Sequence, residues 1–271
     1  MSGSSSMKAN LSDSEFDRYS RQLMLPEWDE TKQLRLSKAT VLIVGCGGLG
    51  TAAGLYLAGA GLGQLVLADN DCVERSNLPR QVAYRETDLG SHKAKALASQ
   101  LRALNGSIQC RAVTRRLSDT ALSLEVSLAD LVLDCSDNMA TRQAVNAACV
   151  IAGKPLIAGA AIGWEGQLMV FDFSQPGTPC YHCLFPSNDD PDIRNCQSAG
   201  VAGPVVGVIG NLQALEALKQ LLGESTLRSQ FTHFDGKSLT LRSMSIPKDT
   251  RCPVCHPGKT ETKEAANADL A

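Results

Sequence analysis

A glycine-rich turn between a strand and a helix constrains this sequence more than any other feature. The turn, Gly45-Cys-Gly-Gly-Leu-Gly50, follows the apolar run Thr40–Val44 and opens a helix of small residues that reaches about Leu62. Asp69 ends the next predicted strand, 24 positions after the first glycine. This combination is typical of a nucleotide-binding domain, in which N–H groups at the helix start face a phosphate and the carboxylate faces ribose hydroxyls. The pattern does not distinguish NAD from ATP, and a tight turn without a ligand is the structural alternative.

Strands and helices are predicted to alternate along most of the chain, which favours an α/β fold with a Rossmann-like, doubly wound and mostly parallel sheet. After residue 160 strands and helices no longer alternate regularly, and the strands expected there predict a C-terminal antiparallel extension. The expected strands are 40–44, 64–68, 108–113, 131–133, 155–160, 165–173 and 238–246, and the expected helices are 93–105, 119–127, 139–152 and 205–222, with one or two more in 13–38, interrupted near Pro26.

Composition argues against several classes of function. The 271 residues carry a formal net charge of -2, so no positive field indicates binding to nucleic acid or to an anionic membrane. No apolar run reaches the roughly 18 residues of a membrane span, and the first ten residues lack the apolar core of a signal peptide. We therefore expect a cytoplasmic protein that binds neither nucleic acid nor membrane.

A polar segment directly after the second strand adds phosphate-binding chemistry. A plain dinucleotide-binding domain does not need Ser76-Asn-Leu-Pro-Arg-Gln81 at this place. Asn77, Arg80 and Gln81 are expected beside phosphates, since an arginine grips a phosphate through two N–H donors. Lys93 follows and adds a point charge. A solvated basic loop is the alternative, and it explains one such residue better than it explains the combination.

Carboxylates follow the fourth predicted strand, in Asp134-Cys-Ser-Asp-Asn138. Ligands of open parallel sheets bind at this end of the strands. Asp137 is predicted to hold Mg²⁺, because Mg²⁺ prefers hard oxygen donors beside phosphates. Asp134 can instead tie down a backbone turn, and a structural role for both carboxylates is the alternative.

Four of the ten cysteines occur as two C-x-x-C pairs, Cys180/Cys183 and Cys252/Cys255, with 68 residues between the pairs. Four thiolates are the ligand set of a structural zinc site, which leaves no open position for catalysis. Two unrelated pairs or a redox role are the alternatives. Cys196 lies between the pairs, near Arg194 in a Gly/Pro/Cys-rich loop at 175–204; a cation can activate such a thiol, but a lone cysteine is more often inert.

Together these motifs resemble the ThiF/MoeB/HesA family, the bacterial relatives of the ubiquitin-activating enzymes. The resemblance covers residues 13–256 and includes Arg18-Tyr-Ser-Arg-Gln22 and Gly203-Pro-Val-Val-Gly-Val-Ile-Gly210. It implies an ATP-dependent adenylyltransferase, a nucleotidyltransferase that activates the C-terminal Gly-Gly carboxylate of a small ubiquitin-like sulfur carrier as an acyl adenylate and releases pyrophosphate. That step needs no enzyme nucleophile, so catalysis consists of positioning and of neutralising phosphate charge.

The resemblance also implies roles for individual residues and the cofactors ATP, Mg²⁺ and Zn²⁺. Gly48 is expected at the phosphates and Asp69 at the ribose, while Arg21 resembles an arginine that reaches into the partner subunit's site and so implies a homodimer. The implied catalytic residues are Arg21, Arg80, Lys93, Asp137 and Cys196. The implied nucleotide-binding residues are Gly45, Gly47, Gly48, Gly50, Asp69, Ser76, Asn77, Arg80, Lys93, Asp137 and Asn138. The implied metal ligands are Cys180, Cys183, Cys252 and Cys255 for zinc and Asp137 for magnesium.

Within the family, three segments look most like ThiF of the thiamine pathway, which favours a ThiS-like carrier and makes Cys196 a candidate for a carrier-linked thiol. These segments are Asp137-Asn-Met-Ala-Thr-Arg-Gln143, Asn146-Ala-Ala-Cys-Val150 and Arg194-Asn-Cys196. Gly159-Ala-Ala-Ile-Gly-Trp-Glu-Gly166 looks more like MoeB of the molybdenum-cofactor pathway, so a MoaD-like carrier is the alternative. Because no room is left for a rhodanese domain before residue 271, a separate sulfur donor protein is expected.

Two other classes of function remain as alternatives. An NAD-dependent oxidoreductase would need a His or a Tyr–Lys pair for proton transfer, and none is evident in the sequence. A non-catalytic zinc scaffold would leave the phosphate-binding cluster unexplained. For the domain organisation we expect a disordered leader at 1–12, one adenylyltransferase domain at 13–257 and a disordered tail at 258–271. Within the domain, 39–160 is the expected nucleotide-binding part and 161–257 the expected zinc- and carrier-binding part.

Overall fold

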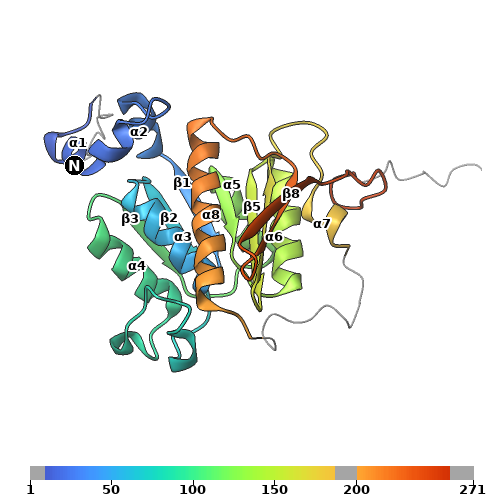
Figure 1. Ribbon diagram of the computed structural model, residues 1–271, viewed down its shortest axis with the longest axis horizontal. Coiled ribbons are helices and arrows are strands. Elements are labelled where there is room, and N and C mark those ends of the chain that lie inside the picture. Colours follow the sequence, from blue (N-terminus) through green and yellow to red (C-terminus); the bar gives the residue numbers. More distant parts are fainter. Residues whose placement is uncertain (1–9, 187–199, 257–271) are drawn as a thin grey trace, which may run out of the picture.

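The computed structural model describes residues 10–186 and 200–256. One eight-stranded sheet runs through the described residues, with helices on both faces (Figure 1). The strands are β1 Thr40–Val44, β2 Gln64–Ala68, β3 Gln109–Val113, β4 Leu131–Asp134, β5 Leu156–Ile162, β6 Glu165–Phe171, β7 Gln230–Asp235 and β8 Thr240–Ser245. The helices are α1 Asp13–Leu23, α2 Glu30–Leu36, α3 Gly48–Gly59, α4 Lys93–Leu104, α5 Asp119–Leu128, α6 Met139–Ala152, α7 Tyr181–Leu184 and α8 Gly203–Leu222, with short 3₁₀ turns at η1 Arg75–Asn77 and η2 Glu86–Asp88.

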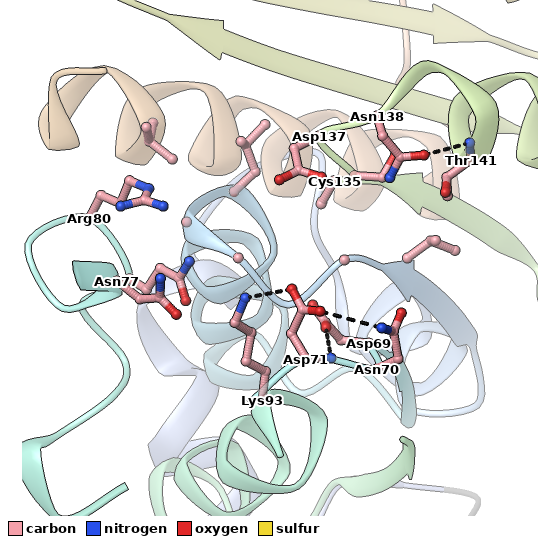
Figure 2. A pocket seen from close by; sticks show the side chains of 18 of the residues that line it. Asp69, Asn70, Asp71, Asn77, Arg80, Lys93, Cys135, Asp137, Asn138 and Thr141 are labelled. Carbon is pink, nitrogen blue, oxygen red and sulfur yellow. Dashed lines mark hydrogen bonds and ion pairs between the residues drawn. The ribbon is translucent and has the colours of Figure 1, made fainter. Parts of the chain in front are cut away.

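The strand order is β3-β2-β1-β4-β5-β6-β7-β8. The first five strands in this order pair in parallel, and β6, β7 and β8 extend the sheet in antiparallel fashion. The prediction of a mostly parallel α/β sheet with an antiparallel C-terminal extension is therefore confirmed. The chain winds in opposite directions from β1 and from β4, so a crevice opens where these two strands end, and Asp137 and Asn138 lie there (Figure 2).

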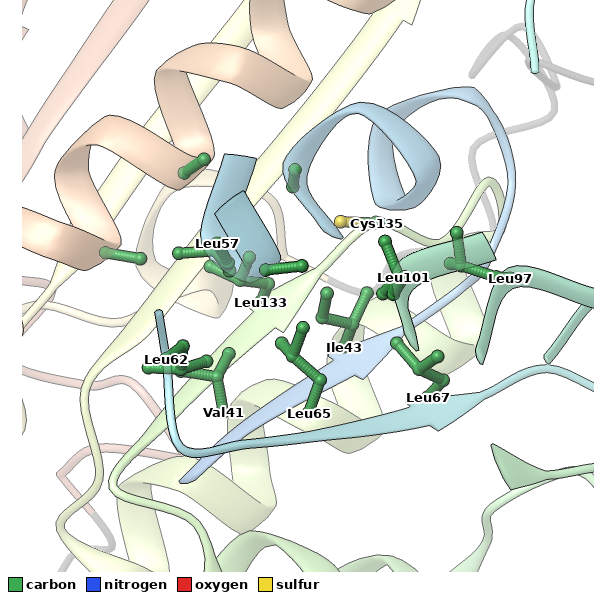
Figure 3. Close-up of a cluster of buried hydrophobic side chains, with 14 of the residues drawn as sticks. Val41, Ile43, Leu57, Leu62, Leu65, Leu67, Leu97, Leu101, Leu133 and Cys135 are labelled. Atoms are coloured by element: carbon green, nitrogen blue, oxygen red, sulfur yellow. The ribbon is translucent and has the colours of Figure 1, made fainter. Parts of the chain in front are cut away.

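Two apolar layers hold the helices against the sheet. Val41 and Ile43 of β1 face α3, α4 and α8, whereas the alternate residues Leu42 and Val44 pack with α5 and α6 on the other face. Figure 3 shows the first layer, in which side chains of β1, β2 and β4 meet leucines of the covering helices, Leu97 and Leu101 among them. Burial on both faces explains why these strands read as continuous apolar runs.

The sequence did not predict β7 or α7. The β7 strand, Gln-Phe-Thr-His-Phe-Asp, lacks an alternation of polar and apolar residues, because its two phenylalanines lie three positions apart and point to opposite faces of the sheet. Phe234 packs with α8, and Phe231 packs against the layer on the other face. The four-residue α7 lies inside the segment expected to be a loop. The interruption expected near Pro26 is confirmed, since α1 ends before it and Asp29 caps α2 through the N–H of Lys32. Among the described helices, none combines the length and apolar character that a membrane crossing requires.

Candidate functional site

A cavity of about 810 Å³ lies around the start of α3, beside the ends of β1, β2 and β4. Its lining comes from segments that are distant in sequence and that the parallel strands bring to one edge of the sheet (Figure 2). Ten of the eleven residues expected to bind nucleotide line it, namely Gly45, Gly47, Gly48, Asp69, Ser76, Asn77, Arg80, Lys93, Asp137 and Asn138.

The remaining expected residue, Gly50, does not line the cavity but packs beneath the turn. A Cβ there would lie 2.0 Å from the carbonyl oxygen of Gly45, so only glycine lets α3 approach the turn so closely. Gly45 itself adopts a φ of +96°, in the left-handed region that favours glycine. A Cβ on Gly48 would lie 2.4 Å from the Val206 side chain of α8. The glycine pattern thus keeps the first turn of α3 open to the cavity.

Asp69 is fixed beside the glycine turn by main-chain donors. Its Oδ2 accepts a hydrogen bond from the N–H of Cys46 at 2.7 Å, and its Oδ1 accepts one from the N–H of Asp71 at 2.8 Å. Burial raises the pKa of Asp69 above its usual value, and these two N–H donors act in the opposite direction. The carboxylate is therefore held in one orientation at the end of β2, where a ribose hydroxyl can reach it.

The cationic side of the cavity is partly pre-ordered. Lys93 begins α4, is 8% exposed, and its Nζ lies 3.0 Å from Asp71 Oδ2 (Figure 2). Arg80 donates through one guanidinium nitrogen to the carbonyl of Ser76 at 2.9 Å. Asn77 accepts a hydrogen bond at Oδ1 from the N–H of Glu74 at 3.1 Å. Both cations thus point into the cavity with donors left over for an anion.

The carboxylates after β4 have different surroundings. Asp134 is 1% exposed and its Oδ1 accepts from both the N–H and the hydroxyl of Ser136, at 3.0 and 2.6 Å. It ties down the turn, which was the structural alternative for this residue. Asp137 is exposed at the cavity, and Asn138 caps α6 by accepting from the N–H of Thr141 at 2.9 Å. Asp137 therefore has the accessible oxygens that a hard divalent cation requires.

Further residues line the cavity that we had not placed at the nucleotide site. Arg115 and Arg116 come from the loop after β3, and Arg142 comes from α6 and donates to the carbonyl of Ser136. Their position just after a strand end, or one turn into the following helix, was the available signal. Gln81, expected beside the phosphates, also lines the cavity; it is 3% exposed, and within the described part of the chain its Oε1 has no hydrogen-bond partner.

Arg21 lies away from this cavity. It is exposed on α1, and α1 packs against the far ends of α3 and α4 through Tyr19 and Gln22. The Tyr19 hydroxyl accepts from the side-chain amide of Asn105 at 3.1 Å, and the Gln22 amide donates to the carbonyl of Ala60 at 2.9 Å. Because the cavity surrounds the beginnings of α3 and α4, Arg21 sits near the opposite edge of the sheet within its own chain.

The four paired cysteines come together in a second location. Their Sγ atoms all lie within 4.8 Å of one another. Cys180 and Cys252 are 3.6 Å apart, Cys183 and Cys255 are 3.4 Å apart, and Cys180 and Cys183 are 4.0 Å apart. Four thiolates around zinc, with Zn–S bonds of about 2.3 Å, place sulfurs roughly 3.8 Å from one another. The donor set therefore fits a tetrahedral metal ion. Cys196 and Arg194, also expected to take part in function, lie outside the described residues.

Comparison with known proteins agrees with this geometry. The model of the ThiF family matches residues 19–254. The chain is 50% identical over 250 residues to the sulfur carrier protein ThiS adenylyltransferase of Escherichia coli (strain K12), covering 90% of this chain and 97% of that protein. It is 46% identical over 260 residues to the adenylyltransferase and sulfurtransferase MOCS3 of Mus musculus, covering 94% of this chain but only 56% of that protein. The chain thus spans about half the length of this second relative.

Solved structures share the fold. The crystal structure of E. coli MccB with ATP superimposes with a TM-score of 0.78 at 27% identity, covering 90% of this chain and 75% of that chain. PaaA superimposes with a TM-score of 0.75 at 23% identity, covering 91% of this chain and 78% of that chain. The second of these similarities concerns the fold alone.

Proposed function

The chain belongs to the ThiF family, and from this premise we propose that it is an ATP-dependent adenylyltransferase that activates the C-terminal glycine carboxylate of a small ubiquitin-like sulfur carrier. The observation that carries the proposal is the cavity, in which the open first turn of α3, the fixed carboxylate of Asp69 and the cations Arg80 and Lys93 face one another. This set of groups matches a nucleoside triphosphate.

The chemistry requires in-line attack of a carrier carboxylate oxygen on the α-phosphorus of ATP, with pyrophosphate as the leaving group. No proton has to move, because the carboxylate is already ionised at neutral pH. Arg80 and Lys93 neutralise the charge that develops on the leaving pyrophosphate, and Asp69 holds the ribose. Asp137 is the residue that would hold Mg²⁺, which supplies further charge neutralisation when bound.

Carrier-dependent exchange of labelled pyrophosphate into ATP tests this function. Exchange is expected with an intact carrier and not with a carrier that lacks its terminal glycine, because the acyl adenylate forms on that residue. Exchange that ignores the terminal glycine, or no exchange with any ubiquitin-like carrier, would contradict the proposal.

We propose a ThiS-like carrier. Support comes from the E. coli relative, whose name states this carrier and 97% of whose length is covered by the alignment with this chain. The MOCS3 relatives and the MoeB-like segment after β5 keep a MoaD-like carrier as the alternative. Parallel exchange assays with the two carriers separate them, and a separate protein is the expected sulfur donor.

For the metal cluster we propose one structural zinc ion held by Cys180, Cys183, Cys252 and Cys255. Support comes from the sulfur–sulfur distances and from the all-thiolate donor set, which suits zinc. Four protein ligands leave no open position, so the ion holds two segments together and takes no part in catalysis.

A homodimer is the proposed functional form. Arg21 lies far from its own chain's cavity and on an exposed helix, which suits an arginine that completes the site of a partner subunit. Cys196 is proposed, from sequence, as the thiol that captures the activated carrier, and the cytoplasm is the proposed location.

A further inference from the structure

The side chain of Asn146 is fully buried between α6 and α7 (0% exposed), and only one of its two polar atoms has a hydrogen-bond partner within the described residues. Its Oδ1 accepts a hydrogen bond from the N–H of Tyr181 at 2.9 Å. Within the described part of the chain, its Nδ2 has no hydrogen-bond partner. A buried amide donor without an acceptor is destabilising, so an acceptor is expected next to this nitrogen.

The residue that Asn146 binds is the neighbour in sequence of a cysteine of the metal cluster. Tyr181 directly follows Cys180, which is itself fully buried and caps α7. A thiolate is a hydrogen-bond acceptor, whereas a thiol is a weak one, so the orphaned N–H suits the deprotonated sulfur of a metal ligand.

The negative charge of the metal-bound cluster explains why a hydrogen-bond donor at this position would be favourable. Four thiolates around a divalent ion carry a net charge of about −2, and two of the sulfurs, those of Cys180 and Cys252, belong to fully buried residues. Buried charge is costly unless hydrogen bonds stabilise it. Nearby N–H donors withdraw negative charge from the thiolates and so help to retain the metal.

A second amide on α6 provides a natural comparison. Gln143 lies one turn earlier and holds the same short segment, donating through Nε2 to the carbonyl of Phe185 at 2.6 Å. Its Oε1 lies 3.3 Å from Nδ1 of His182. Gln143 therefore anchors α7 to α6, and no hydrogen bond joins it to a cysteine within the described residues.

We propose that Asn146 is a positioning residue of the metal cluster: its Oδ1 fixes the start of α7, and its Nδ2 donates a hydrogen bond to the metal-bound thiolate of Cys180. This inference rests on the proposed zinc site. It makes α6, which begins at the cavity with the cap Asn138, the element that also stabilises the cluster.

The test uses the zinc-loaded full chain and the variant Asn146→Asp, which keeps an oxygen for the Tyr181 N–H but replaces the Nδ2 donor with a charged oxygen. Zinc release to a chromogenic chelator is expected to be about 10- to 100-fold faster than in the parent. In the cobalt-substituted protein, the thiolate-to-cobalt charge-transfer band is expected at lower energy, because a thiolate without its hydrogen bond donates charge more readily. Gln143→Glu is the matched control and is expected to stay near the parent in both measurements.

Zinc release and cobalt spectra like those of the parent in Asn146→Asp would overturn the proposal. If that variant does not fold, Asn146→Leu is compared with Gln143→Leu, since each loses one amide that anchors α7. Faster release only from Asn146→Leu supports the proposal, and equal release from both overturns it. A parent protein that contains no metal would instead refute the zinc site itself, and the metal content of the parent keeps the two failures distinct.

Discussion

The nucleotide cavity and the four-cysteine cluster are built in opposite ways. The cavity takes its residues from the ends of strands whose register is fixed by main-chain pairing, such as Val44 with Ala68 of β2 and with Asp134 of β4. The cluster joins segments 72 positions apart, Cys180 with Cys252, and its first pair lies on a helix of only four residues. The fold therefore shapes the cavity, whereas we expect the cluster to depend on the proposed zinc ion. Substitutions in the cavity should lower the rate of adenylation without unfolding the protein. Substitutions in the cluster should lower stability and leave most of the adenylation activity in place.

The largest expected effect comes from Asp137→Ala. We expect carrier-dependent pyrophosphate exchange to fall by about 10²–10³-fold, because the variant removes the proposed Mg²⁺ ligand. The free energy of unfolding should change by less than about 0.5 kcal/mol, since Asp137 is exposed at a strand end. Exchange close to the parent rate would remove Asp137 from the mechanism, and unfolding would contradict the claim that the cavity is shaped by the fold.

A hybrid experiment extends the contrast to the partner subunit. Arg21→Ala and Asp137→Ala are each expected to be nearly inactive, but mixed dimers of the two chains would contain one intact site if Arg21 acts on the partner's cavity. Random mixing should then restore about a quarter of the parental exchange rate. No recovery in dimers shown to have exchanged subunits would assign Arg21 to its own chain or to no catalytic role.

Substitution of a cluster cysteine is expected to reduce stability more than activity. Cys252→Ser is expected to lose zinc and to lower the unfolding temperature by roughly 5–10 °C, because the two segments are then no longer joined. The rate of pyrophosphate exchange at low temperature should fall by less than about 10-fold, since none of the four cysteines lines the cavity. Ser245→Ala, which changes an exposed residue at the end of strand β8, is a control expected to retain zinc. Zinc content unchanged in Cys252→Ser would contradict the proposed ligand set.

The sequence predicted the parallel half of the fold well because its central strands β1, β2 and β4 are buried on both faces and read as apolar runs. The first two of them are also followed by residues typical of a nucleotide-binding fold. Gly45 and Asp69 could be placed for this reason. The antiparallel half was harder, since β7 has no period-2 pattern: Phe231 and Phe234 lie three positions apart and pack on opposite faces, between neighbours at 165–171 and 240–245. Arg115 was missed because an exposed basic loop has no residue motif of its own, and only its position just after the end of β3 indicated the cavity.

The smallest effect on adenylation is expected from Cys196→Ala, a position that lies outside the described residues. Phosphate chemistry needs no thiol, so pyrophosphate exchange should stay within about 2-fold of the parent, whereas capture of the acyl group does need one. In a reconstituted sulfur-transfer assay, mass spectrometry should show little carrier thiocarboxylate. Parental amounts of thiocarboxylate would show that Cys196 has no role, and loss of exchange would indicate that this segment supports the ATP site.

The central claim is that the cavity directs a carrier carboxylate to the α-phosphate of ATP. The most direct test uses the Cys196→Ala variant, in which acyl capture cannot release the label as AMP. The variant and its carrier are incubated with ATP labelled in either the α- or the γ-phosphate, and the label on the carrier is followed in the absence of a sulfur donor. We expect the α-label to appear on the intact carrier, with pyrophosphate released, and no label on a carrier that lacks its terminal glycine. The γ-label should not appear on the carrier at all. Transfer of the γ-label with release of ADP would contradict the account, because it would show phosphorylation of the carboxylate instead of adenylylation.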